Sequence, residues 1–194
     1  MRPRNFPACS ISLKAKLKRE AFGGAGELEI LNWAEVILAT VELMGSEFER
    51  IHSNLLGVLE VIPEDRLYWK PFESASFIHV YSCGELISHI GGATEYAFNG
   101  ITTNFWEEPF EWITREALPT RSHVAAYLEE AARVRRIAFA DLKDEDLPKL
   151  VYYPNATGTT IGEILIKTLT HTSHHRGQVY AYVHLLSGAR LPAV

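Results

Sequence analysis

Apolar residues recur at every third or fourth position along four stretches of the chain, which is the spacing of one face of an α-helix. The first stretch begins near Glu29 and continues to about Ile62. It ends there because Pro63 disfavours helical geometry in the residue before it. The pattern predicts a long helix that faces the core, followed by an ordered connection that reaches Ser76.

The second helix is marked at its start by a capping box. Ser82 is placed to accept a hydrogen bond from an early backbone N–H, and Glu85 is placed to reach back to the backbone of Ser82. We expect this helix to end at Asn99-Gly100, a pair that tolerates left-handed backbone. The predicted helix therefore covers about residues 82–99.

The third and fourth helices also carry cap signals. Thr120 or Ser122 is expected to cap a helix that runs to about Leu142. A second capping box, Thr160-Ile161-Gly162-Glu163, predicts the start of the last helix, with Gly188 as its stop. The link between these two helices contains residues 150–153, which are expected to form a short extended piece.

Four helices joined by long links predict an all-α fold, a four-helix bundle with crossover connections. We expect one domain over residues 29–194. Residues 1–28 are expected to be a flexible N-terminal extension, because Gly23-Gly24-Ala25-Gly26 separates the basic opening stretch from the first patterned segment.

Composition narrows the function classes. The 194 residues are 47% hydrophobic and 22% charged, which is typical of a globular domain, and the formal net charge is -5. The absence of a dense Lys/Arg stripe after the first residues argues against nucleic acid as a partner. No segment has the ~20 consecutive apolar residues that span a membrane. Two cysteines, Cys9 and Cys83, are too few for a disulfide framework, so a cytoplasmic location is expected.

Histidines supply the candidate chemistry. His171 and His175 are four residues apart in the last predicted helix, which stacks two imidazoles on one face, and His89 lies in the middle of the second helix. Three nitrogen ligands from two packed helices would leave a position open for water or substrate. A helix-borne histidine is more often a surface or core residue than a ligand, so spacing alone leaves both interpretations open. His52, His79, His123 and His184 have no evident partner and are expected to have surface or local hydrogen-bonding roles.

The second-helix histidine together with the segment His171-Thr172-Ser173-His174-His175-Arg176-Gly177-Gln178 resembles the DinB family of helical-bundle metalloproteins (DinB/YfiT-like). Residues 59–71, with Ile62-Pro63-Glu64 and Tyr68-Trp69-Lys70-Pro71, resemble that family's link into the first metal helix. The resemblance spans about residues 29–188. It implies His89, His171 and His175 as metal ligands, a divalent ion such as nickel, zinc or iron, and a homodimer.

The neighbours of these histidines refine the expected chemistry. Thr172 and Ser173 stand where a metallopeptidase helix would carry its glutamate base, so a thermolysin-like peptidase is disfavoured. Glu85 lies one turn before His89 and is the candidate catalytic base, although its capping role competes with that function. His174 is offset by about 100° from His175 and is expected at the edge of the site or in a helix contact.

Each of the three residues that follow His175 has its own expected role. Arg176 is expected to pair with an acidic residue on a neighbouring helix, and Gly177 to permit close helix packing. Gln178 is expected to reach the rim of the cavity. Five aromatic residues could line a substrate pocket, but core packing is the favoured interpretation for them: Trp69, Tyr96, Phe98, Trp106 and Trp112.

Two classes of function follow. The first is a metal-dependent enzyme that acts on a small molecule. The resemblance implies transferases and isomerases that use low-molecular-weight thiols such as bacillithiol or mycothiol, and hydrolysis is the neighbouring possibility. The second is a non-catalytic metal-binding or stress-related binding protein, because members of the family are commonly linked to stress responses without a defined reaction. An open three-histidine site favours the enzyme, since structural zinc is usually closed by four protein ligands.

Overall fold

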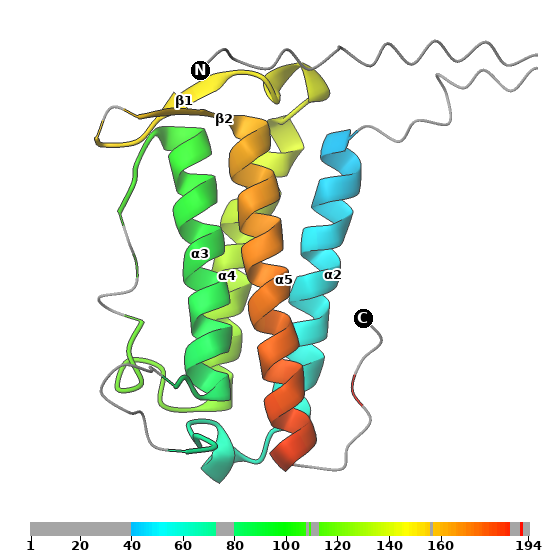
Figure 1. The fold of residues 1–194 in the computed structure, drawn as a ribbon, viewed down its shortest axis with the longest axis vertical. Coiled ribbons are helices and arrows are strands. Elements are labelled where there is room, and N and C mark those ends of the chain that lie inside the picture. Colours follow the sequence, from blue (N-terminus) through cyan, green and yellow to red (C-terminus); the bar gives the residue numbers. More distant parts are fainter. Residues whose placement is uncertain are drawn as a thin grey trace, which may run out of the picture.

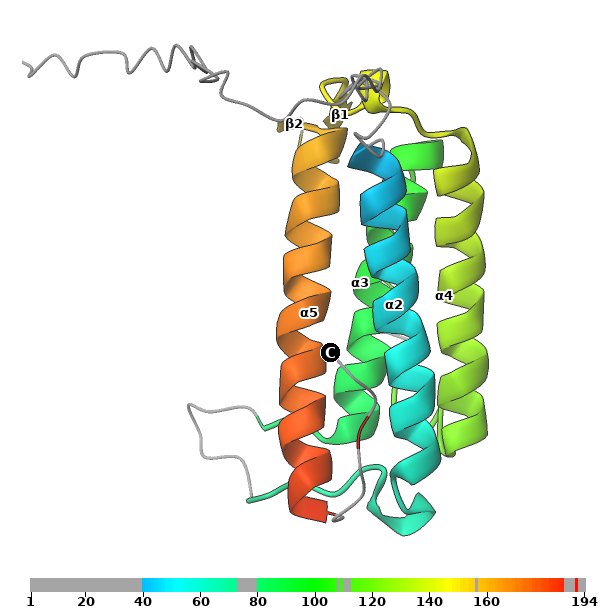
Figure 2. The ribbon, with the colours of Figure 1, turned by 90° about the vertical axis from the view of Figure 1, so that its right-hand side faces the viewer.

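The computed structural model describes residues 40–72, 80–107, 109, 113–155, 157–186 and 191. In this part of the chain four long helices run side by side along the molecule (Figures 1 and 2): α2 (Thr40–Val61), α3 (Cys83–Thr103), α4 (Arg121–Asp141) and α5 (Ile161–Leu186). Helices α3 and α4 run in the same direction, opposite to α2 and α5. A crossover over residues 104–120 is therefore needed, which confirms the predicted all-α bundle with crossover connections.

The helix contacts fix the order around the bundle. Helix α3 packs against α4 and α5, and α2 packs against the same two helices. Helices α2 and α3 therefore occupy opposite corners. The interface between α3 and α5 is antiparallel, so residues near the middle of one helix face residues near the middle of the other.

Short elements lie in the connections. The 3-10 turn η1 (Glu64–Arg66) follows α2, and η3 (Asp144–Asp146) follows α4. Strands β1 (Leu150–Tyr152) and β2 (Gly158–Thr160) form an antiparallel hairpin at the end of the bundle where α3 ends and α5 begins (Figure 1). The extended piece expected over residues 150–153 is thus β1, which is one residue shorter.

Both predicted capping boxes are confirmed. The Ser82 backbone N–H donates to Glu85 Oε2 over 2.6 Å, and the Glu85 N–H donates back to Ser82 Oγ over 3.3 Å. The Thr160 N–H donates to Glu163 Oε2 over 3.0 Å, and the Glu163 N–H donates to Thr160 Oγ1 over 3.1 Å. Thr120 caps α4, as one of the two expected residues. Capping satisfies backbone donors that have no partner within the helix.

The predicted end of the second helix is wrong. Helix α3 passes through Asn99-Gly100 to Thr103, and Asn104 is the residue with left-handed backbone, at φ 54°. Gly100 has a different use, because a Cβ atom there would lie 2.3 Å from the ring of Trp106. The glycine therefore permits an indole ring to lie against the helix backbone.

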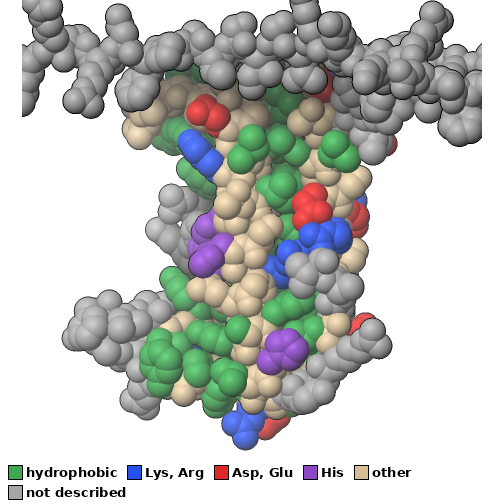
Figure 3. All heavy atoms as spheres, turned by 45° about the vertical axis from the view of Figure 1, so that its right-hand side comes forward, with side chains coloured by type: hydrophobic (Ala, Val, Ile, Leu, Met, Phe, Trp, Pro, Cys, Tyr) green, Lys and Arg blue, Asp and Glu red, His purple; other side chains and the backbone are tan. Residues whose placement is uncertain are grey.

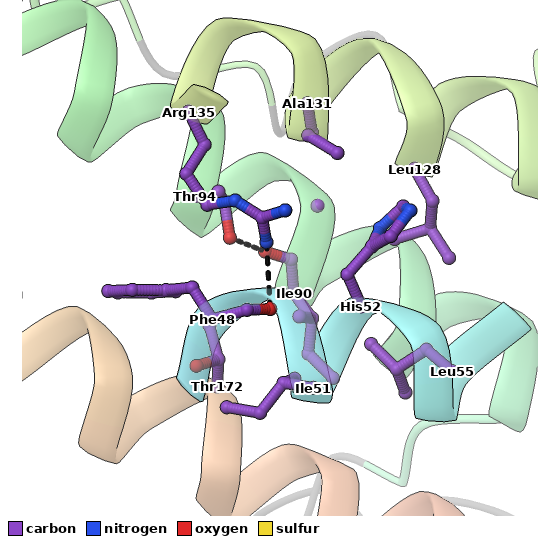
Figure 4. A pocket seen from close by; sticks show the side chains of 12 residues that line it. Phe48, Ile51, His52, Leu55, Ile90, Thr94, Leu128, Ala131, Arg135 and Thr172 are labelled. Carbon is purple, nitrogen blue, oxygen red and sulfur yellow. Dashed lines mark hydrogen bonds between the residues drawn. The ribbon is translucent and has the colours of Figure 1, made fainter. Parts of the chain in front are cut away.

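The core consists of two clusters along the bundle axis. One contains Phe48 and Phe98, whose rings meet edge to face with centroids 5.3 Å apart. The other is aliphatic and includes Leu55 and Val58, which have no exposed surface. Side chains of both clusters line an interior cavity of about 20 Å³ (Figure 4), which is room for one water molecule. No helix in the described part of the chain is long and apolar enough to cross a membrane.

Candidate metal site

Three histidines that are distant in sequence meet at the α3/α5 interface. His89 comes from the middle of α3, and His171 and His175 lie one turn apart on α5. One ring nitrogen of each lies within 4.8 Å of the corresponding nitrogen of the others, and the Nε2 atoms of His89 and His171 are 2.9 Å apart. Histidine side chains reach the molecular surface in the middle of the bundle (Figure 3).

This arrangement fits a divalent cation. Tetrahedral zinc bound by imidazole nitrogens at 2.0–2.1 Å holds those nitrogens about 3.3 Å apart, which lies between the 2.9 Å separation of His89 and His171 and the 4.8 Å limit for all three pairs. No carboxylate or thiol joins the three imidazoles in the described residues. Three neutral nitrogen ligands suit zinc, nickel or iron and leave a coordination position for an external ligand.

The local electrostatics keep two of the imidazoles, those of His89 and His171, unprotonated. Burial lowers the pKa of His89 to about 4, with His175 and His171 adding to the effect. The pKa of His171 is also lowered, first by burial and then by His175 and His174. Metal ions bind the neutral form of imidazole, so these two ligands are in the ligating form at neutral pH.

Gln178 orients one of the candidate ligands. The side-chain oxygen of Gln178 accepts a hydrogen bond from His175 Nδ1 over 2.7 Å. Because an amide oxygen only accepts, Nδ1 of His175 carries the proton, and Nε2 is free for a metal. Partners of this kind fix the tautomer and direction of a metal-ligating histidine. The sequence predicted only a position at the rim for Gln178, although the i,i+3 spacing from His175 was the available signal.

Glu85 is fully engaged at the start of α3. Its Oε2 accepts hydrogen bonds from the backbone N–H and hydroxyl of Ser82, and its Oε1 accepts from Lys70 Nζ over 3.0 Å. Burial favours the neutral carboxyl, but the hydrogen bonds outweigh burial and lower the pKa of Glu85. A lowered pKa makes a carboxylate a weaker base. The role of Glu85 as a catalytic base stays a prediction.

The residues next to the last candidate ligand differ in part from expectation. His174 is not one of the three convergent histidines, but its ring lies 5.1 Å from that of His175, at the edge of the site as expected. The packing role expected for Gly177 is wrong, because a Cβ atom there would meet nothing within 4 Å. Arg176 is buried, and its Nη1 has no hydrogen-bond partner among the described residues. Its charge nevertheless contributes to the lowered pKa of Glu47 on the neighbouring helix α2, so the expected interaction with an acidic residue is present as a longer-range attraction.

A groove opens beside the histidines. Its volume is about 360 Å³, and His89 and His171 form part of its wall. Of the five aromatic residues considered from the sequence, Tyr96 and Trp106 line this groove, whereas Phe98 is buried in the core. Core packing was therefore the wrong interpretation for Tyr96, whereas Trp106 both lines the groove and packs against the core cluster that contains Phe98. Trp69 is half-buried in the link after α2, and Trp112 lies outside the described residues.

The remaining histidines are apart from this site. His52 is buried and its Nε2 lies 3.2 Å from Glu129 Oε1 of α4. His123 contacts Thr120 at the start of α4, and His184 is exposed near the end of α5. Local hydrogen bonding or surface exposure, as expected, accounts for the latter two, but the buried contact of His52 was not foreseen. His79 lies outside the described residues.

A crossover four-helix bundle with three histidines gathered between two of its helices defines the class of the protein, a helical-bundle protein with a candidate metal centre. The model of the DinB superfamily matches residues 47–179, which include all three histidines. The chain belongs to the DinB superfamily. A search of curated proteins found no match.

Three solved structures have a fold similar to that of this chain. A DinB-like protein from Bacillus subtilis is 20% identical, with a TM-score of 0.62 over 78% of this chain and 96% of its own. A DinB-like protein from Bacillus cereus is 18% identical, with a TM-score of 0.59 over 78% and 95% of the two chains. A conserved protein from Enterococcus faecalis is 15% identical, with a TM-score of 0.59 over 78% and 99%. At these identities the similarity shows the fold alone.

Proposed function

We propose that the protein binds a divalent cation, nickel, zinc or iron, through His89, His171 and His175 and uses it to transform a small molecule. The convergence of three imidazoles from two packed helices carries this proposal. The adjoining groove adds a place for a substrate within reach of the same histidines. Catalytic metal sites keep a position open beside three protein ligands, as this cluster would.

Thiol-dependent group transfer is the reaction that the surroundings favour. A bound cation would supply a lowered pKa for a coordinated thiol or water molecule. Addition of a thiol to an electrophilic double bond forms one S–C bond, breaks the S–H bond and the π bond, and moves the thiol proton to the acceptor atom that gains the electron pair, so no protein group has to protonate a leaving group. Hydrolysis needs such a group, and Glu85, the nearest candidate, has a lowered pKa and three hydrogen bonds. We therefore place the transferase before the hydrolase.

A non-catalytic role is the second candidate. The engagement of Glu85 in the cap of α3 supports it, because the site then lacks its expected base. In that case the cation would serve binding or a stress response without turnover. The homodimer implied by the family resemblance and the cytoplasmic location expected from cysteine content belong to the proposal in either case.

Elemental analysis tests the metal site first. Protein purified without a His-tag and without added metal is compared with a variant in which His89, His171 and His175 are all alanine. We expect near-stoichiometric zinc, nickel or iron in the native chain and none in the variant. Equal metal content in the two proteins would reject the ligand assignment.

Turnover then separates the two candidates. The metal-loaded protein is incubated with an electrophilic substrate in the presence and absence of a low-molecular-weight thiol. Thiol-dependent consumption that the triple variant lacks supports the transferase. Consumption without a thiol supports the hydrolase, and a loaded protein inactive on broad panels of both kinds supports the binding protein.

A further inference from the structure

We infer that the groove beside the three histidines binds the electrophilic acceptor substrate, and that this acceptor has a flat apolar body and one anionic group. The body would lie against Trp106 and Tyr153, and the anion would lie at Lys167. The inference rests on the proposed function, because the histidines mark the end of the groove at which the reaction would take place.

The groove has the size and lining of a small-molecule site. Its volume of about 360 Å³ lies within the range of ligand pockets, which are mostly apolar with a few placed polar groups. Small apolar side chains from both helices, including Ala93, Ala97 and Ile164, leave room between α3 and α5. A planar molecule could lie along these helices with one end at His89 and His171.

Aromatic rings form one wall of the groove. The ring of Trp106 lies 4.6 Å from that of Tyr153 and 5.2 Å from that of Tyr96, measured between centroids. The three rings come from the crossover after α3, from the residue after β1 and from α3 itself. Rings at such distances offer faces and edges on which another aromatic group can stack.

The position of Trp106 is set by specific contacts. Its Nε1 donates to Asn104 Oδ1 over 3.0 Å, and Asn104 is the residue with left-handed backbone after α3. The ring then lies so close to Gly100 that no side chain fits between them. The aromatic wall is thus held in place before any ligand arrives, which lowers the entropy cost of binding.

Lys167 supplies the charge. It lies on α5 one turn before His171 and is the positively charged residue that lines the groove. Glu163, one turn before Lys167, accepts hydrogen bonds from Thr159 Oγ1 and the Thr160 N–H over 2.9 and 3.0 Å, and the charge of Lys167 adds only the smallest contribution to its lowered pKa. No carboxylate of the described residues lies within ion-pair distance of Lys167. An anionic ligand would complement this ammonium group, and a cationic one would be repelled.

The lining favours the acceptor over the thiol as the occupant. Low-molecular-weight thiols carry sugar or peptide groups that need several hydrogen bonds. The groove offers two alanines, an isoleucine and three aromatic rings along most of its length. Apolar surface of this kind gains most from an apolar ligand.

Binding of 2-naphthoate and of its neutral analogue 2-naphthamide to the full chain tests the inference. Dissociation constants are measured by calorimetry in metal-free and in zinc-loaded protein. We expect naphthoate to bind at least about tenfold more tightly than naphthamide in both forms. A preference that appears only with zinc would show that the carboxylate binds the metal, and would overturn the role of Lys167.

A substitution at Lys167 gives the sharper test. In Lys167→Gln we expect the two probes to bind equally, with the affinity for naphthamide unchanged. Lys149→Gln is the matched control, because Lys149 is already paired with Asp146 outside the groove, and it should keep the full preference. A preference that persists in Lys167→Gln would reject the assignment.

The aromatic wall is tested separately. In Gly100→Ala the new methyl group displaces Trp106, and we expect both probes to bind about tenfold more weakly while their ratio is kept. Gly177→Ala is the matched control, since its methyl group meets nothing within 4 Å. Trp106→Ala replaces Gly100→Ala if that variant does not fold. Unchanged affinities in the folded variant would overturn the wall assignment.

Failure of this inference can be told from failure of the proposed function. Metal content is measured on the same samples as probe binding. Absent probe binding with stoichiometric metal rejects the groove inference alone. Probe binding with no metal, even after reconstitution, rejects the proposed function and leaves the groove as a binding site. Displacement of naphthoate by glutathione in the metal-free protein would overturn the assignment of the groove to the acceptor.

Discussion

Two helix interfaces in this bundle hold polar side chains in opposite ways. At the α2/α4 interface Arg135 is only 3% exposed, and it pairs with Glu49 and donates to the carbonyl of Phe48 over 2.7 Å (Figure 4). His52 in the same interface lies against Glu129. At the α3/α5 interface the side chains of three histidines converge on one another, with one ring nitrogen of each within 4.8 Å of those of the other two.

The difference separates polar residues that stabilise the fold from polar residues that are placed to bind a ligand. Buried charges are tolerated when opposite charges and carbonyls surround them, as at Arg135. Three imidazoles gathered at one point can each donate a nitrogen lone pair to the same cation. The α3/α5 cluster is therefore the place at which we propose a cation, and four experiments test this comparison.

The largest effect is expected from His175→Ala. Loss of one of three ligands should weaken metal binding at least about 1,000-fold, more than the loss of an outer partner of a ligand costs. Metal affinity is measured by competition with a chromophoric chelator, and helix content by circular dichroism should be unchanged. His184→Ala, an exposed histidine on the same helix, is the control and should bind metal normally. Normal affinity in His175→Ala would remove His175 from the site.

Arg135→Ala should reduce stability and leave metal binding unchanged, which is the reverse of what we expect for His175→Ala. It leaves the Phe48 carbonyl without its side-chain donor and breaks the pair with Glu49, so we expect the free energy of unfolding to fall by about 2–4 kcal/mol. Metal affinity should stay unchanged. Urea denaturation measures the loss, and Arg133→Ala, which breaks an exposed pair with Glu130, should leave the free energy of unfolding almost unchanged. Equal losses in the two variants would contradict the structural role of Arg135.

Gln178→Ala should affect the metal without affecting the fold. Removal of the acceptor from His175 Nδ1 frees the imidazole to rotate and to change tautomer, so we expect metal affinity to fall about 10-fold. Gln178→Glu restores an acceptor and should recover the affinity. The chelator competition used for His175 measures both variants. An alanine variant with native affinity would show that Gln178 does not orient the ligand.

The smallest effect concerns pH and His52. Burial lowers the pKa of His52, against the raising effects of Glu129 and Glu49 and together with the lowering effect of Arg135. A depressed pKa in the folded state means that the unfolded chain binds the proton first. The contribution of His52 to the free energy of unfolding is fully present above the unfolded-state pKa of about 6.5. It is lost as the pH falls below that value, by at most about 1.4 kcal/mol per pH unit.

Comparison of the metal-free native chain with His52→Gln isolates this contribution. Between pH 7.5 and 5.5 the native chain should lose more of its free energy of unfolding than the variant does. Other groups, the metal-site histidines included, contribute equally to both proteins and cancel in the difference. Parallel pH profiles would show that His52 does not titrate differently in the two states.

Local signals in the sequence were sufficient for much of the fold. The capping boxes at Ser82 and Thr160 depend only on residues three apart, and they placed the starts of α3 and α5. The end of α3 was misplaced because Gly100 serves a contact with Trp106, which lies in another segment. Asn99-Gly100 resembles a helix end when only neighbouring residues are considered, but Gly100 is needed for a tertiary contact. The pattern of residues along the helix does not contain that information.

The candidate site also combines features that local sequence predicts with features that depend on tertiary contacts. His171 and His175 share a helix, so their spacing placed them on one face. The position of His89 in the middle of the second amphipathic helix made it their candidate partner, and the resemblance to a family agreed with that choice. The groove could not be foreseen, because Trp106 and Tyr153 come from connections whose positions depend on the packing of the whole bundle. Gly177 was assigned to packing, but it faces open space, since its helix turns that side to solvent.

The attachment of Trp106 has a consequence for how such proteins diversify. The three histidines lie in the rigid middle of α3 and α5, whereas Trp106 and Tyr153 lie in the connections at one end of the bundle. Mutations in these connections can alter what the groove accepts without moving the histidines or weakening the core. Under the proposed function, evolution could thus vary the recognised molecule and keep the three histidines, and Gly100 is the position at which Trp106 rests on the helix that carries His89.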